Sequence, residues 1–228
     1  MNVVVSHTLP PPARDALSAH AHIIPFATHG ITYPYLSGHA DLFMVPGPTW
    51  VLAPNTPPHV ALQLRLHGVP HTRGTTPVDA TLAGASAYNA AVHPHLLVAN
   101  PDRLDPAVRH IYPDAPLIAV RQGLSRCTTL ILDPTHVVTS DGGVHKALRR
   151  AGIDSLLVDP RPIRLPGCRN GCFGGCCGLH HGRLYIVGSL DAHPQGADIR
   201  RYVAHTHVTD IIELHQGPLT DVGSLMFF

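Results

Sequence analysis

The chain has 228 residues and a formal net charge of +1; 44% of the residues are hydrophobic and only 14% are charged. This composition excludes a disordered chain, and without a concentrated basic face we expect no nucleic-acid partner. No stretch approaches the roughly 18 consecutive apolar residues that cross a bilayer, so we expect no membrane partner either. The length is sufficient for one domain, residues 1–228, with its own core.

The N-terminal residues predict a strand rather than a secretion signal. MNVVVSHTLPPP has no basic residue and only a short apolar run, unlike a signal peptide. We therefore expect a cytoplasmic protein in which the five cysteines, an odd number, stay reduced. A strand is predicted at residues 3–5, a helix at 13–22 and a second strand at 23–26.

A repeated hairpin pattern follows along the chain. In four places two short apolar runs flank a few turn residues, which is typical of β-hairpins. The paired runs are residues 43–45 with 50–53, 90–92 with 96–99, 130–132 with 137–139, and 178–179 with 184–187. Each hairpin is followed by a helical pattern and then by another apolar run. The predicted helices are 59–67, 106–111, 143–151 and 198–205, and the runs after them are 68–71, 117–120, 155–158 and 211–214. Asp105 and Asp141 are placed to cap two of these helices.

The segments before the hairpins can be aligned with one another. Comparable segments occur every 40 to 50 residues or so, a period typical of repeated units. They are GHADLFMV, AYNAAV, SRCTTLIL, GGCCGL and LTDVGSLMFF. The alignment makes five residues equivalent: Asp41, Asn89, Cys127, Cys177 and Asp221. The fifth unit is split between the two termini, and pairing the ends would remove exposed sheet edges. We therefore expect a ring of five β-β-α-β units, an α/β-propeller; the alternative is a generic α/β sandwich.

Five β-β-α-β units resemble the pentein, or guanidino-group-modifying enzyme, fold of arginine and agmatine deiminases, dimethylarginine hydrolases and amidinotransferases. GHADLFMV is similar to the Gly-His-x-Asp segment of the deiminases. Six segments together resemble an uncharacterised bacterial family of this fold. They are YPYLSGHADLFMV, AYNAAV, VRQGLSRCTTLILD, TSDGGVHKALRRAGIDSLLV, GCFGGCCGL and PLTDVGSL. The resemblance extends over residues 33–228 and implies a five-bladed pentein propeller with the fifth unit shared between the termini.

The resemblance also implies catalytic residues. In catalytic penteins a thiolate attacks the carbon of a guanidinium or amidinium group, a histidine transfers protons, and carboxylates hold the cationic nitrogens. His39 and Asp41 match this motif, and two residues that are two apart on a strand point the same way. The matching C-terminal stretch has no cysteine; Ser224 offers only a hydroxyl. Cys127 is therefore the predicted nucleophile, since the neighbouring Arg126 could favour its thiolate, although Cys127 could be an ordinary buried cysteine.

Four further residues are expected to line the central pocket and bind substrate: Asn89, Asp141, Cys177 and Asp221. Asp41 and Asp221 together would attract a cation. Simpler roles are open for two of them, since Asp141 could only cap a helix and Asp221 could be a turn residue before Gly223.

We therefore expect a deiminase-like hydrolase that needs no cofactor and acts on a small guanidino, amidino or amide compound. The missing C-terminal cysteine favours an alternative, a non-catalytic pentein that binds a ligand or a macromolecule, as a ribosome anti-association factor of this fold does. A minor alternative is a metal site within residues 168–177, where Cys168, Cys172 and Cys176 have spacings of the order found in zinc sites and His180 or His181 could complete the set. We assign no metal ligands, and the sequence leaves the oligomeric state open.

Overall fold

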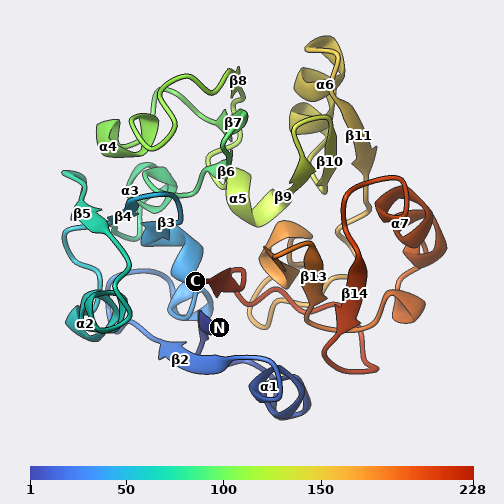
Figure 1. Ribbon diagram of the computed structural model, residues 1–228, viewed down its shortest axis with the longest axis horizontal. Helices are drawn as coiled ribbons and strands as arrows, with labels where there is room; N and C mark the ends of the chain where they lie inside the picture. Colours follow the sequence, from blue (N-terminus) through green and yellow to red (C-terminus); the bar gives the residue numbers. More distant parts are fainter.

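Five three-stranded sheets make up the computed structural model, which describes residues 1–228. In every sheet the middle strand pairs antiparallel with one neighbour and parallel with the other. In four sheets the antiparallel partner belongs to a hairpin, and in all five the parallel partner follows a helix, as a parallel connection requires. Figure 1 shows the five units arranged around the middle of the molecule. The prediction of a mixed α/β fold with five repeated units is confirmed in this form.

The elements follow the chain in five groups. After the 3₁₀ turns η1 (Pro34–Leu36) and η2 (Ala40–Leu42) come β3 (Met44–Val45), β4 (Trp50–Leu52), α2 (Pro58–Leu66) and β5 (His71–Arg73). The second group is α3 (Leu82–Ser86), β6 (Ala91–His93), β7 (Leu96–Ala99), α4 (Pro106–Arg109) and β8 (Leu117–Ala119). The third is α5 (Ser125–Thr128), β9 (Thr129–Asp133), β10 (His136–Thr139), α6 (Gly142–Arg150) and β11 (Asp154–Leu157). The fourth is η3 (Gly174–Cys176), β12 (Cys177–His180), β13 (Arg183–Ile186), η4 (Leu190–Ala192), α7 (Gly196–Val203) and β14 (Asp210–Glu213). The fifth is β15 (Met226–Phe227) with β1 (Asn2–Ser6), α1 (Pro11–Ser18) and β2 (His22–Phe26).

The fifth sheet joins the two ends of the chain. β1 pairs antiparallel with β15, with Val3 opposite Phe227, and parallel with β2. The chain termini consequently lie close together (Figure 1). The predicted pairing of the C-terminal strand with the N-terminal strands is confirmed.

Two strands differ from their predicted bounds for local reasons. β5 begins at His71 instead of residue 68, because Gly68 has a φ of 69° at the end of α2 and Pro70 has no N–H for a sheet. β15 contains only two residues, because Gly223 and Ser224 have φ values of 70° and 69°, which are incompatible with a strand. The predicted strand over residues 223–228 was therefore too long.

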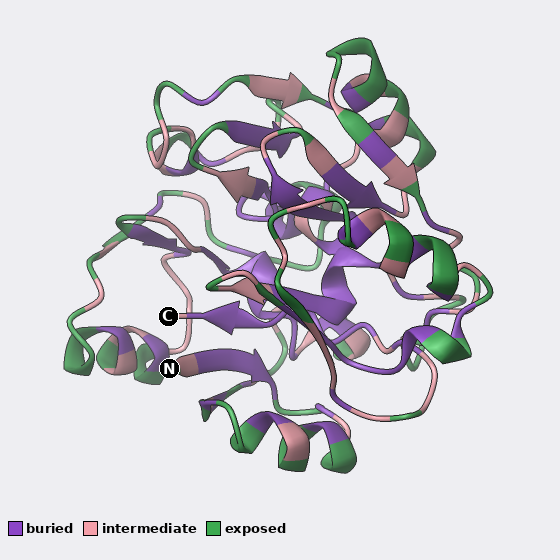
Figure 2. Ribbon diagram, turned by 45° about the vertical axis from the view of Figure 1, so that its right-hand side comes forward, coloured by how far each residue is buried: buried purple, intermediate pink, exposed green.

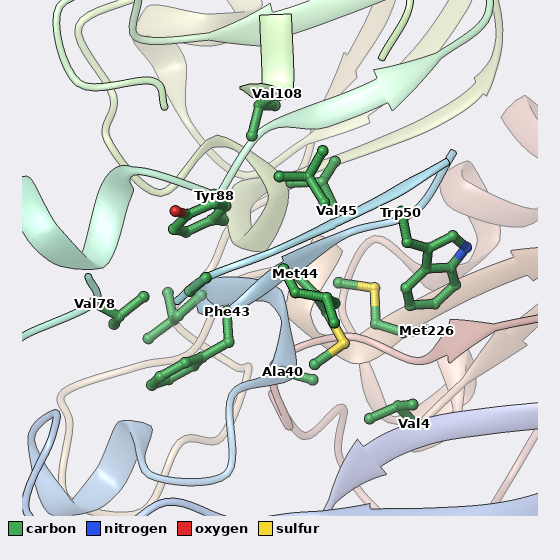
Figure 3. Close-up of a cluster of buried hydrophobic side chains, with 14 of the residues drawn as sticks. Val4, Ala40, Phe43, Met44, Val45, Trp50, Val78, Tyr88, Val108 and Met226 are labelled. Atoms are coloured by element: carbon green, nitrogen blue, oxygen red, sulfur yellow. The ribbon is translucent and has the colours of Figure 1, made fainter. Parts of the chain in front are cut away.

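The strands near the middle of the molecule are buried, whereas each helix exposes one face (Figure 2). In α6 the buried residues Val144 and Leu148 are four apart, as expected of an amphipathic helix. The largest apolar cluster links several units: Val4 and Met226 of the fifth unit lie near Met44 of the first (Figure 3). This shared core holds the inner ends of the sheets at fixed positions. None of the helices combines the length and apolar character required to span a membrane.

The buried carboxylate of Asp105 ties the first two units together. Its Oδ2 accepts hydrogen bonds from the backbone N–H groups of Thr75 and Thr76, both at 2.8 Å, and from the Tyr88 hydroxyl at 3.1 Å. Its Oδ1 accepts from the Ala107 N–H at 2.9 Å, which confirms the predicted cap of α4. Burial alone would raise the pKa of Asp105, but the backbone hydrogen bonds from Ala107, Thr76 and Thr75 outweigh it and lower the pKa to about 2.

Replacement of Asp105 by alanine is expected to lower the free energy of unfolding by roughly 3 kcal/mol, because several buried donors lose their acceptor. The matched control, Asp102→Ala, removes an exposed carboxylate and should change stability by less than about 0.5 kcal/mol. The pKa of Asp105 is lower in the folded state, so its contribution is present above about pH 4 and disappears as the pH falls to about 2. Urea unfolding should therefore show a difference between wild type and variant that shrinks over this range; a constant difference would contradict the role of the ionised carboxylate.

Candidate functional site

The polar residues at the middle of the molecule come from three different units. His39 and Asp41 lie directly before β3, Cys127 lies in α5 before β9, and Asp221 and Ser224 lie before β15. The segment with His39 and Asp41 forms the 3₁₀ turn η2, not the expected strand, because the Leu42 and Phe43 N–H groups bond to the His39 and Ala40 carbonyls. The two side chains nevertheless face each other: His39 Nδ1 lies 3.9 Å from Asp41 Oδ1.

Cys127 is held by two side chains from other units. Its thiol donates to Asp41 Oδ2 at 3.0 Å and accepts from Asn89 Nδ2 at 3.2 Å. Asn89 Oδ1 also accepts from the Cys127 backbone N–H at 3.1 Å, and Asn89 Nδ2 donates to the Asp41 carbonyl at 3.0 Å. Asn89 therefore fixes Cys127 against Asp41, so the structure brings together three of the predicted residues.

Ser224 completes the contacts of Asp41. Its hydroxyl, fully buried, lies 2.8 Å from Asp41 Oδ2 and 3.2 Å from the Gly174 carbonyl, so the one proton is shared between these acceptors. Ser224 has a φ of 69°, a conformation that is unfavourable for a residue with a side chain. The strain is maintained by the surrounding packing and directs the hydroxyl to the carboxylate. Sequence reasoning identified this hydroxyl but not its carboxylate partner.

The His39 ring lies between two carboxylates. Its Nδ1 faces Asp41, and its Nε2 lies 3.9 Å from Asp221 Oδ1. Asp221 is positioned by the Gly223 N–H at 3.0 Å and by the Cys172 N–H at 2.9 Å. The turn role expected for Asp221 is therefore real, yet the same carboxylate also faces the histidine.

Neither carboxylate has a lysine or arginine partner; His39 is the sole ion-pair neighbour of both. Arg126 was expected to favour a thiolate at Cys127, but its guanidinium donates to the Thr129, Gly174 and Cys177 carbonyls. That expectation was wrong, because the side chain is directed along the backbone of the neighbouring unit and not toward the thiol.

Burial raises the pKa of the Cys127 thiol well above its usual value, and the nearby Asp41 and Asp221 carboxylates raise it further. Burial also raises the pKa of Asp221, against the opposing effect of His39. The thiol is therefore protonated at neutral pH. A cation bound among these groups would favour the thiolate, since opposite charge stabilises the ionised form.

A cavity of about 460 Å³ opens beside this group. His39 and Asp221 form part of its wall, whereas Cys127 and Asp41 lie behind them. The remainder of the wall, which sequence reasoning missed, consists of Thr8, Pro10, Pro34, Tyr35, Ser37, Gly38, Leu165, Pro166, Gly167, Thr220 and Val222. Tyr35 and Gly38 lie in YPYLSGHAD, and their closeness to His39 in sequence was the one available indication. Of the polar residues at the middle of the molecule described above, a ligand in this cavity can therefore contact His39 and Asp221.

Two predicted pocket residues lie outside this group. Asp141 caps α6 by accepting from the Val144 N–H at 2.8 Å, and it accepts from Gln122 at 2.8 Å. Cys177 packs in the apolar core of the third and fourth units, where burial raises the pKa of its thiol to about 12. No hydrogen bond joins either side chain to His39, Asp41 or Cys127.

Cys177 lies outside the group because the predicted alignment of the fourth unit with the third was wrong by two residues. Cys127 lies two residues before the first residue of β9, whereas Cys177 is itself the first residue of β12. The counterpart of Cys127 in the fourth unit is therefore Gly175. A Cβ atom on Gly175 would overlap the Asp221 carboxylate, so this glycine makes room for Asp221. The two adjacent cysteines had obscured this equivalence.

The other cysteines are also free thiols. Cys168 is exposed, and Cys176 is buried with its thiol directed to the Cys172 carbonyl at 3.3 Å. The cysteines at residues 168–177 do not form a group of metal ligands with His180 or His181. The group of three ligand-type side chains in this structure is His39, Asp41 and Cys127.

Comparisons with known proteins agree with this architecture. The agmatine deiminase of C. Jejuni matches with a TM-score of 0.55 and 8% identity, over 92% of this chain and 74% of that chain. A substrate-bound variant of the C. Jejuni enzyme matches with a TM-score of 0.31 and 9% identity, over 88% of this chain and 54% of that chain. No curated protein matches significantly. The first likeness shows that the fold is that of agmatine deiminase. Residues 4–226 match the sequence family described as "Family of unknown function (DUF6873)", and the chain therefore belongs to that family.

Proposed function

We propose that this protein is a hydrolase that cleaves a C–N bond in a small guanidino or amidino cation. We also propose that the five sheets form a five-bladed pentein propeller, a single domain over residues 1–228, with the reaction at its axis. The observation that carries the proposal is the position of His39 between two buried carboxylates, one of which binds the Cys127 thiol. The fold likeness to an agmatine deiminase supports the class of substrate.

Substrate binding would use the unpaired negative charge. A planar guanidinium or amidinium presents several N–H donors that match the geometry of carboxylate oxygens. Asp221 would meet the cation at the cavity wall and Asp41 would bind it further in. The bound cation would replace the missing lysine or arginine partner, because buried carboxylates require a compensating charge.

Cys127 would then act as the nucleophile. The positive charge of the substrate lowers the pKa of the thiol, His39 accepts its proton, and the sulfur attacks the central carbon to form a C–S bond. His39 returns the proton to the departing amine as the C–N bond breaks. Water next attacks the same carbon and gives one proton to His39. As the C–S bond breaks, His39 returns this proton to the sulfur, and the remaining hydroxyl proton leaves to solvent as the carbonyl forms. The net reaction consumes one water and yields a carbonyl product and an amine.

A second candidate function is non-catalytic binding of the same class of cation. It is favoured by the protonated thiol and by its position behind the cavity wall. In this case Asp41 and Asp221 would bind the ligand, and Cys127 would serve as a buried hydrogen-bond donor to Asp41.

A panel of small guanidino and amidino compounds, assayed for amine release and by calorimetry, separates the two candidates. For the hydrolase we expect turnover by the wild type and by Cys168→Ser, which changes an exposed thiol. Turnover should fall by more than about a hundredfold in Cys127→Ser and in His39→Ala. Binding without turnover supports the second candidate, and the absence of both contradicts both proposals.

A further inference from the structure

Three potential metal ligands converge at the middle of the molecule. His39, Asp41 and Cys127 each direct one ligand-type atom to the same place, and these atoms lie within 4.8 Å of one another. Imidazole, carboxylate and thiolate are the three donor types that zinc binds, and three protein ligands are typical of zinc sites with an open position. We propose that these residues bind a divalent transition-metal ion of the zinc class, with its open position toward the cavity. This inference goes beyond the proposed hydrolysis and does not depend on it.

Two buried polar atoms point to such a ligand. His39 Nδ1 and Asp41 Oδ1 have no hydrogen-bond partner, and their residues are 3% and 0% exposed. An unpaired buried polar atom costs about 1–3 kcal/mol, so a native site that keeps two of them facing each other calls for a partner. Their separation of 3.9 Å is close to the roughly 3.3–3.7 Å between neighbouring ligands of a tetrahedral zinc with ordinary bond lengths. Because the three ligand atoms are within 4.8 Å of one another and not yet at ligand spacing, the histidine ring would move inward when the metal binds.

The neighbouring residues suit an anionic ligand set. Asn89 Nδ2 donates to the Cys127 sulfur at 3.2 Å, and the Ser224 hydroxyl lies 2.8 Å from Asp41 Oδ2. Asp221 lies 3.9 Å from His39 Nε2, on the side of the ring away from Asp41. At this distance Asp221 does not accept a hydrogen bond from the ring, but its negative charge favours a cation bound at the other ring nitrogen, as outer carboxylates near ligating histidines do. No lysine or arginine competes for the negative charge.

The binding step balances with one proton. Without metal, the Cys127 thiol donates a hydrogen bond to Asp41. When the metal binds, a metal–sulfur bond replaces the S–H bond, and the thiol proton leaves to solvent. The bound metal would occupy ligand atoms of His39, Asp41 and Cys127, the residues that the proposed reaction also requires. Metal-loaded protein should therefore neither react at Cys127 nor bind a guanidinium between the carboxylates.

The test is a titration of the metal-free, full-length chain with Zn²⁺ and with Co²⁺, without any substrate. We expect one equivalent to bind, and the Co²⁺ complex should show a thiolate-to-cobalt charge-transfer band. Cys127→Ser and His39→Ala should each weaken binding by more than about a hundredfold, and Asp221→Asn by about tenfold to a hundredfold. Cys168→Ser, outside the site, should bind as the wild type does.

The proposal is overturned if no stoichiometric metal binds, or if Cys127→Ser binds normally while Cys168→Ser or Cys176→Ser loses the metal. The latter result would place the metal at residues 168–177. If circular dichroism shows that Cys127→Ser does not fold, the Co²⁺ spectrum of the wild type provides the test instead. A Co²⁺ complex without a thiolate-to-cobalt band contradicts the proposed site. Because no substrate is used, the titration result does not depend on whether the protein is a hydrolase. Failure of the metal proposal likewise leaves the hydrolase proposal unaffected.

Discussion

Chloroacetamidine is expected to alkylate Cys127 in the native chain about tenfold to a hundredfold faster than the neutral chloroacetamide does. The two reagents have the same shape and leaving group, and the sulfur displaces chloride in both cases. The amidinium alone can pair with Asp221 and Asp41, and hydrogen bonds to charged groups contribute about 1.5–3 kcal/mol. Peptide mapping by mass spectrometry after timed quenching measures both rates.

Cys168 provides an internal control. This exposed thiol lies outside the site formed by Asp41 and Asp221, so it should react with both reagents at similar rates. His39→Ala should slow alkylation of Cys127 by roughly a hundredfold, since the ring accepts the thiol proton. Cys127 that resists the amidinium in the native chain but reacts fully in the unfolded chain would falsify the role of this thiol as nucleophile.

Replacement of Gly223 by alanine is expected to destabilise the fold and to disrupt the site at the same time. Gly223 has a φ of 70°, and a Cβ atom there would overlap the Cα and Cβ of His39. A left-handed conformation costs an alanine about 1–2 kcal/mol, and the backbone overlap adds about 1–3 kcal/mol. We therefore expect the free energy of unfolding to fall by roughly 2–5 kcal/mol, with loss of chloroacetamidine labelling at Cys127 in the molecules that still fold.

Gly142→Ala is the matched control. Gly142 begins α6, its φ is not positive, and no atom lies within 4 Å of the Cβ position. Alanine there should change stability by less than about 1 kcal/mol and leave labelling intact. If Gly223→Ala unfolds in urea like the wild type and is labelled normally, then the close approach of Gly223 to His39 does not determine the site.

The repeated units could be predicted because each depends on local patterns. The apolar runs before and after turns such as Asp133–His136 bend the chain into a hairpin regardless of the remaining units. The caps Asp105 and Asp141 were likewise readable, because a capping residue acts on the next few residues. Strand ends were less predictable: those of β5 and β15 depend on the positive φ angles of Gly68 in the first case and of Gly223 and Ser224 in the second.

The site could be predicted only in part. A motif resemblance made His39 and Asp41 candidates, and the repeat did the same for Cys127, Asn89 and Asp221. The hydrogen bond of Ser224 to Asp41 spans 183 residues of sequence, and no local pattern encodes such a contact.

The predicted role of Arg126 failed for a similar reason. Its carbonyl partners belong partly to the next unit, 48 and 51 residues further along the chain. The assignment of Cys177 failed because the two adjacent cysteines drew the alignment two residues past Gly175, the residue at the position equivalent to Cys127.

The most direct test of the central claim is a crystal structure of Cys127→Ser with a small guanidino compound bound. The variant removes the nucleophile and should leave the carboxylates in place. We expect a planar cation with nitrogens hydrogen-bonded to both Asp41 and Asp221, and with its carbon about 3–3.5 Å from the hydroxyl of residue 127. A cation bound elsewhere, or a site that stays unchanged at saturating ligand, would contradict it.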